Sequence, residues 1–116
     1  MKKSLVIFLG ILMVAFSAFS AEIIVEQKNK LFFYQDKQLT PDTVIAAKVG
    51  DVLRFVNADT VVHNLFSLSE GMVFDVGPQY PKDQNGQDVI VPLKKAGLLK
   101  VECAIHPQMT LQIKID

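Results

Sequence analysis

The stretch "LLKVECAIHPQMTLQIKI", residues 98–115, contains two segments of alternating polar and apolar residues, joined by a short loop. Successive side chains of a β-strand point to opposite faces of its sheet. Lys100 and Glu102 therefore face water in the first segment, and Cys103 at its end faces the core. The stretch predicts two strands of a sheet that has one buried face.

The second segment extends the same pattern toward the loop. Gln112 and Lys114 take the outward positions, so the apolar residues between them point inward. The same parity turns Met109 inward if the strand begins that early. His106 lies in the loop itself, so a cysteine, a histidine and a methionine follow one another at intervals of three residues.

The rest of the chain after residue 21 also consists of short segments rich in β-branched and aromatic residues, separated by turn material. No convincing helical periodicity is present there, although "SEGMVFDVG", residues 69–77, has room for one short helical turn. About eight strands at this spacing predict an all-β domain, a sandwich or a barrel. The remaining predicted strands are residues 22–27, 31–35, 43–49, 51–57, 61–68 and 88–93.

The first twenty residues have the pattern of a secretory signal peptide. Lys2 and Lys3 precede an apolar run, and small residues lead up to Ser20. We expect cleavage after Ser20, export to the periplasm, and a single domain over residues 21–116 that does not insert into the membrane. The alternative is a membrane anchor, but a spanning helix needs about 20 apolar residues, and this run is shorter.

The charge of the expected mature domain argues against nucleic acid as a partner. Removal of Lys2 and Lys3 leaves ten basic and twelve acidic side chains, a formal net charge of −2. Nucleic-acid binding favours a basic face. The single cysteine, Cys103, cannot form an internal disulfide, so in an exported protein its thiol calls for burial, intermolecular pairing or metal ligation.

Three interpretations of the loop remain open from its residues. In the first, Cys103 and Met109 are ordinary packing residues and His106 is a surface residue. The second is a nucleophilic Cys–His pair, which also needs an orienting group and an oxyanion site that the sequence does not indicate beyond Asn64. The third is a metal site, in which thiolate, imidazole and thioether converge.

The metal interpretation accounts for the complete histidine and cysteine inventory of the chain. Two histidines and one cysteine, with a weak axial methionine, are the ligand set of blue-copper centres. His63 is the only histidine besides His106, and it falls in the predicted strand at residues 61–68. We therefore favour a copper site.

Two motifs together resemble the cupredoxins, the family of small blue-copper proteins. "VGDVLRFVNADTVVHN", residues 49–64, is similar to the family's first ligand region, and "CAIHPQM", residues 103–109, to its short Cys-x2-His-x2-Met loop. This loop length is that of amicyanins and plastocyanins, and the chain resembles especially the methylamine-utilisation type. The resemblance covers residues 22–116 and implies a Greek-key β-sandwich.

The resemblance also implies a role for each residue of the site. His63, Cys103 and His106 would be the equatorial copper ligands, with both imidazoles bound through Nδ1, and Met109 the axial ligand. His63 would be buried, and the ring edge of His106 would lie in an apolar surface patch. Asn64 would tie the His63 strand to the cysteine loop and supply hydrogen bonding near the thiolate.

With all four positions filled by protein, no open position remains for a substrate, so we expect an electron carrier and not an enzyme. One copper ion would cycle between Cu(I) and Cu(II). The partners would be redox proteins such as a dehydrogenase, a cytochrome or an oxidase, and we expect a monomer. The alternative function is a copper-binding module that delivers or buffers the metal for another cuproprotein.

Overall fold

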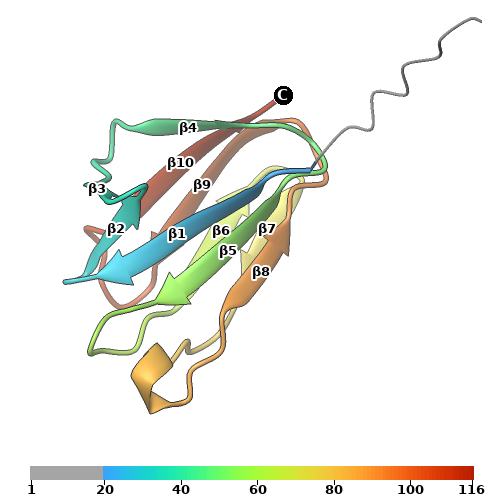
Figure 1. Ribbon diagram of the computed structural model, residues 1–116. Helices are drawn as coiled ribbons and strands as arrows, with labels where there is room; N and C mark the ends of the chain where they lie inside the picture. Colours follow the sequence, from blue (N-terminus) through green and yellow to red (C-terminus); the bar gives the residue numbers. More distant parts are fainter. Residues whose placement is uncertain (1–19) are drawn as a thin grey trace, which may run out of the picture.

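The computed structural model describes residues 20–116, and the predicted signal peptide lies outside them except for Ser20. The described residues form ten β-strands and one short 3-10 helix (Figure 1). The strands are β1 (Glu22–Lys28), β2 (Leu31–Tyr34), β3 (Lys37–Gln38), β4 (Val44–Ala47), β5 (Val52–Asn57), β6 (Leu65–Ser69), β7 (Met72–Asp75), β8 (Val89–Pro92), β9 (Gly97–Cys103) and β10 (Thr110–Ile115), and the 3-10 helix η1 spans Lys82–Gln84.

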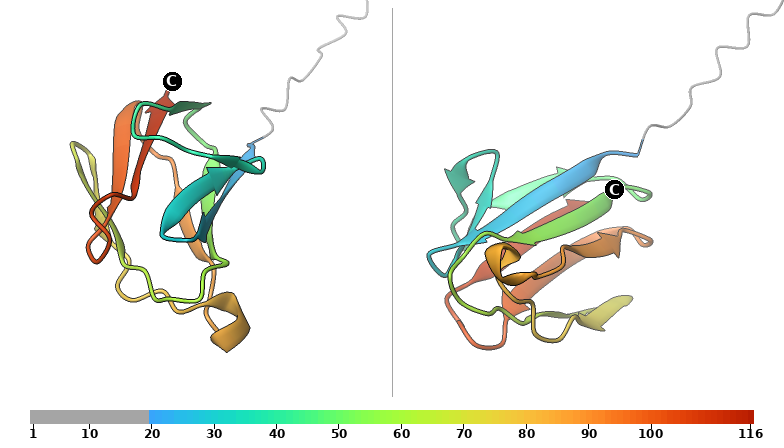
Figure 2. Two further views of the ribbon diagram at one scale, coloured as in Figure 1. Left: turned by 90° about the vertical axis from the view of Figure 1, so that its left-hand side faces the viewer. Right: turned by 60° about the horizontal axis from the view of Figure 1, so that its bottom comes forward.

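The strands form two sheets of five, packed face to face as a sandwich (Figures 1 and 2). The strand orders are β3-β2-β1-β5-β8 and β4-β10-β9-β6-β7. The β1–β5 and β4–β10 pairs are parallel, and the other pairs are antiparallel. The predicted all-β sandwich is therefore confirmed.

Alternation along the strands builds the core between the sheets. The β9 and β10 strands bury every second residue, as the polar residues on their outer faces predicted. The opposite sheet contributes Phe32 and Phe55, whose rings pack with centroids 6.4 Å apart. The buried hydrophobic residues of both sheets belong to one cluster, which includes Cys103 and Met109. The predicted inward direction of these two residues is confirmed.

The structure differs from the sequence prediction in strand number. The segment at residues 69–77 contains the turn of a β6–β7 hairpin followed by β7, so the helical turn considered there was wrong. Only two of the four residues of β7 are even partly buried, which leaves a weak alternation signal. The strand β3 has just two residues, both exposed, and was also missed. Ten strands replace the predicted eight.

The parallel pairing of β1 with β5 determines which connections meet at one end of the sandwich. Gln27 lies opposite Asn57 at the ends of these strands, so the β1–β2 turn and the loop after β5 leave the sheet side by side. The loop between β9 and β10 reaches the same end (Figure 1). Within residues 20–116, no helix has the length and apolar character that a membrane crossing requires.

Candidate metal centre

Cys103 is the last residue of β9 and is only 2% exposed. Its amide donates to the carbonyl of Met109 at 3.3 Å, which closes the β9–β10 loop at its base. Because the strand alternation already directs residue 103 inward, the thiol points into the sandwich and away from bulk water.

The loop after Cys103 folds as a tight turn. The amide of Met109 donates to the carbonyl of His106 at 2.9 Å, with Pro107 at the second position of this turn, where its fixed φ is favourable. Met109 is 1% exposed, one residue before β10 begins, whereas His106 is half-buried. Its neighbours Ile105 and Pro107 are exposed, so the histidine lies among apolar surface residues.

His63 reaches the centre from the segment between β5 and β6 and is completely buried. It precedes β6, so the prediction that it lies within a strand was wrong. A single antiparallel bridge to Gln79 holds its backbone instead, with N–O distances of 3.1 and 2.7 Å. These two hydrogen bonds fix the backbone of His63 without a regular strand.

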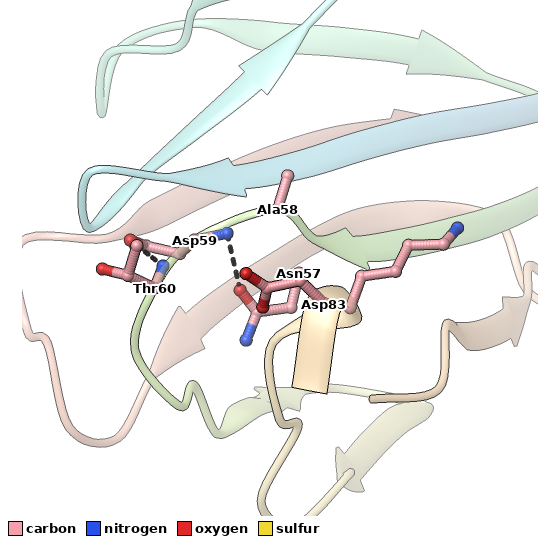
Figure 3. Close-up of a pocket in the computed structure, with 6 residues that line it drawn as sticks. Asn57, Ala58, Asp59, Thr60 and Asp83 are labelled. Carbon is pink, nitrogen blue, oxygen red and sulfur yellow. Dashed lines mark hydrogen bonds between the residues drawn. The ribbon is translucent and has the colours of Figure 1, made fainter. Parts of the chain in front are cut away.

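Figure 3 shows the loop that leads from β5 toward His63. The side-chain oxygen of Asn57 accepts the amide of Asp59 at 3.0 Å, and Asp59 in turn accepts the amide of Thr60 at 2.7 Å. The Asn57 side chain also donates to the carbonyls of Val61 and Gln79. These hydrogen bonds fix the backbone conformation of the loop. The depression beside it is lined by residues 57–60 with Lys82 and Asp83, and His63, Cys103 and His106 are not among its lining residues.

The loops bring His63, Cys103 and His106 together. The Sγ atom of Cys103 lies 3.7 Å from Nδ1 of His63 and 3.6 Å from Nδ1 of His106. The two Nδ1 atoms are 3.1 Å apart. The rings meet edge to face, with centroids 4.8 Å apart and an interplanar angle of 62°. Three potential ligand atoms thus face one another, and both imidazoles present Nδ1.

These distances fit three ligands of one metal ion. With metal–nitrogen bonds of about 2.0 Å and a metal–sulfur bond of about 2.3 Å, three ligands spread evenly in a plane place nitrogen and sulfur about 3.7 Å apart. A nitrogen–nitrogen distance of 3.1 Å corresponds to an angle of about 100° at such an ion. Soft sulfur with two imidazoles suits copper, so the cluster is suited to a single copper ion.

Asp59 also belongs to this centre, and the sequence analysis missed its role. Its Oδ2 atom lies 2.9 Å from Nε2 of His63, on the side of the ring opposite the cluster, and its side chain is 6% exposed. Asp59 precedes His63 by four residues, but outside a helix this spacing does not predict a contact. A carboxylate next to a ligating histidine is a common arrangement in metal sites.

Asn64 ties its segment to the cysteine loop, but through its backbone. Its carbonyl accepts the amide of Ala104 at 2.8 Å. The side chain instead donates to Asp75 at 2.7 Å, on the surface of the β6–β7 hairpin. The hydrogen bonds recorded for this side chain in the described residues do not include one to the cysteine loop, in contrast to the role that the resemblance implied.

Burial and neighbouring positive charge both act on His106. Desolvation of the ring lowers its pKa, and charge on His63 and on Lys30 lowers it further, while Asp59 acts weakly in the opposite direction. The structure thus favours the neutral imidazole, which is the form that binds a metal.

The comparisons with known proteins concern the sequence and the fold of the chain. No family model matches the chain. The methylamine utilization protein MauL of Methylorubrum extorquens is 33% identical over 75 residues, which are 64% of this chain and 62% of that protein. The match thus spans less than two thirds of that relative.

Among solved structures, a variant of amicyanin in its Cu(I) form superposes with a TM-score of 0.60 at 18% identity, over 82% of each chain. The domain has the cupredoxin fold. The purple cupredoxin of Nitrosopumilus maritimus superposes with a TM-score of 0.59 at 19% identity, over 84% of this chain and 100% of that one. These superpositions bear out the fold that the sequence motifs indicated.

Proposed function

We propose that this cupredoxin domain is a type 1 copper protein that carries single electrons between redox proteins of the periplasm. The observation that carries the proposal is the convergence of the Cys103 sulfur and the Nδ1 atoms of His63 and His106 within 3.1–3.7 Å of one another. Residues 40 positions apart in sequence meet at one point with one thiolate and two imidazoles, the equatorial set of a blue-copper centre.

His63, Cys103 and His106 would hold the ion through one thiolate and two imidazoles, and the thioether of Met109 would be a fourth, weaker ligand. When bound, copper supplies a one-electron couple between Cu(I) and Cu(II). The protein contributes rigidity and exclusion of water: the side chains of His63, Cys103 and Met109 are buried, and the sheets fix the backbone at both ends of the cysteine loop. A site held in one geometry changes little during electron transfer.

The same arrangement favours a carrier over an enzyme. His63, Cys103, His106 and Met109 would supply four protein ligands, and substrate chemistry at a metal normally needs an open position. His106 is half-buried between the exposed residues Ile105 and Pro107. Its ring edge would be the place where an electron passes between the site and a partner, and the apolar surface around it would form part of the contact.

Residues 1–20 as a cleaved signal peptide and residues 21–116 as the mature domain are part of the proposal. The apolar leader supports export. The partners would be a dehydrogenase, a cytochrome or an oxidase, and the domain would act as a monomer.

A visible absorption spectrum tests the copper site directly. Residues 21–116, loaded with Cu(II), should give an intense thiolate-to-copper band, and reduction should bleach it. Absence of the band at one bound copper per chain would refute a blue-copper centre.

Retention of the metal separates a carrier from a copper-delivery module. The loaded protein should keep one copper per chain through repeated reduction and reoxidation in the presence of a competing Cu(I) chelator. Release of copper to the chelator on each reduction would favour delivery instead.

A further inference from the structure

We infer that Asp59 is a positioning residue for the copper site: it keeps the proton of His63 on Nε2, leaves Nδ1 free for the metal, and couples this ligand to the β1–β2 turn. The inference rests on the proposed function, because it concerns the same site. Its first test uses the metal-free protein, so a result against this inference can be distinguished from a result against the proposed function.

The hydrogen bonds around Asp59 determine the direction of its bond to His63. Oδ2 accepts the backbone amide of Lys30 at 2.8 Å, and Oδ1 accepts the amide of Thr60 at 2.7 Å. Both amides are donors only, so the carboxylate meets them as an acceptor. An ionised carboxylate has no proton to give, and Nε2 of His63, 2.9 Å from Oδ2, must therefore be the donor.

The electrostatics of Asp59 agree with this ionised form. Each of its two oxygens accepts a backbone amide, at 2.8 and 2.7 Å, and such hydrogen bonds favour the charged form of a carboxyl group. A buried carboxylate with three donors stays charged at neutral pH.

The tautomer of His63 follows from this bond. A neutral imidazole carries one N–H and one lone pair. With the proton held on Nε2 by Asp59, the lone pair is on Nδ1, the atom that faces Cys103 and His106. The opposite tautomer would direct a proton into the metal site and block ligation. Asp59 thus selects the one neutral form of His63 that can bind copper in this geometry.

The β1–β2 turn holds the carboxylate in place. Asn29 and Lys30 have φ values of 52° and 58°, the left-handed conformation of both central residues in a two-residue hairpin turn. This conformation directs the amide of Lys30 at Oδ2 of Asp59. The parallel β1–β5 pair places the turn beside the loop that carries Asp59. One carboxylate oxygen is thereby shared between a copper ligand and a turn from a different part of the chain.

The first test is the tautomer of His63 in metal-free wild-type protein, measured by the nitrogen chemical shifts of its ring. We expect the proton on Nε2. A proton on Nδ1 would overturn the inference without any mutation, even if copper binding itself were normal.

The second test compares Asp59→Ala with Asp59→Asn. The alanine variant removes the acceptor, so both tautomers should be populated, the Lys30 amide should exchange faster, and Cu(II) affinity in competition with a chelator should fall about 10–100-fold. The asparagine variant can keep its oxygen toward His63 and Lys30 and lose only the bond to Thr60, so the Nε2 tautomer should persist. Because it removes a negative charge that favours Cu(II), its reduction potential should rise.

Asp51→Asn is the matched control. Asp51 is also a shielded carboxylate, 8% exposed, and it accepts the amides of Ala21 and Lys48, but it precedes β5, whereas Asp59 follows this strand. This variant should change neither the His63 tautomer nor the potential. A wild-type tautomer and wild-type copper affinity in Asp59→Ala, or an equal shift of potential in Asp51→Asn and Asp59→Asn, would overturn the inference.

Discussion

The Nδ1 atoms of His63 and His106 lie 3.1 Å apart, although 43 residues separate them in the chain. Two neutral imidazoles at this distance share at most one proton between these atoms, and a metal ion removes the crowding by accepting both lone pairs. This short distance places the two histidines in one cluster with Cys103, but the surroundings of the two rings differ. His63 is buried against Asp59 and Gln79, whereas His106 borders solvent.

Cys103→Ser should bind Cu(II) without the intense blue band. The colour comes from the thiolate, and the expected mature chain has no second cysteine to replace it. His63 and His106 remain, so some metal affinity should persist. Absorption spectra at equal copper content measure the effect, and a band of wild-type intensity would disprove the site.

Met109→Gln should lower the reduction potential while the thiolate colour remains. The thioether is a soft ligand that favours Cu(I), and an amide oxygen favours it less. Met72→Gln is the control, because Met72 is the other methionine of the described domain and lies on β7, away from the three ligand atoms. Voltammetry gives both potentials. Equal potentials in wild type and Met109→Gln would reduce Met109 to a packing residue.

His106→Gly should recover the blue band when imidazole is added, and His63→Gly should not. His106 is half-buried at the surface, so a small ligand can enter from solvent. His63 has no exposed surface, and its place is enclosed by the Gln79 bridge and Asp59. Titration of both copper-loaded variants with imidazole makes the comparison. Similar recovery in the two would contradict the difference in access.

The stability of the metal-free protein should fall as the pH drops below about 6.5. Burial of the ring lowers the pKa of His106, and so does positive charge on His63 and on Lys30. Asp59 has a weak opposing effect. The unfolded chain, in which the pKa is about 6.5, then binds a proton more readily than the folded chain. The stabilisation is complete above that pH and is lost toward the lower folded-state pKa.

Urea unfolding at pH 7.5 and 5.5 measures this change, and His106→Gln should reduce it. Three carboxyl groups with lowered pKa, those of Asp51, Asp59 and Asp75, release their stabilisation only at more acid pH. They therefore do not interfere in this range. An equal change in the free energy of unfolding between the two pH values, in the wild type and the variant, would show that the pKa of His106 does not differ between the folded and unfolded states.

Asn64→Ala should leave the position of the blue band nearly unchanged. The bond to the cysteine loop comes from the backbone carbonyl of Asn64, which the substitution keeps, and its side chain bonds only Asp75 in the described structure. We expect only a small loss of stability, because the hydrogen bond that is lost is exposed to solvent. Asp75→Ala should cost more stability, because it also loses the bond from the amide of Gly77, and the double variant should show coupling. A large spectral shift in Asn64→Ala alone would restore the role that the resemblance implied.

The sequence by itself determined most strands of the domain and the direction of Cys103 and Met109. Period-two alternation depends on neighbours in the chain, so the polar residues Lys100, Glu102 and Gln112 were enough to direct their apolar neighbours inward. The candidate ligands could also be read from the sequence, because one cysteine and two histidines allow only one set of two imidazoles and a thiolate. The weakly alternating β7 and the two-residue β3 carried too little of this signal.

The tertiary structure alone decided how these residues meet. The backbone of His63 is hydrogen-bonded to Gln79, and its ring is hydrogen-bonded to Asp59. Asp59 is in turn held by the amide of Lys30 in the β1–β2 turn, 29 residues earlier. No pattern of period two contains such contacts, because they join segments that are not neighbours in one strand, and the bond from Lys30 follows from the parallel pairing of β1 with β5. Long-range pairing thus determines the orientation of the imidazole, and only an oriented imidazole presents its lone pair to a metal.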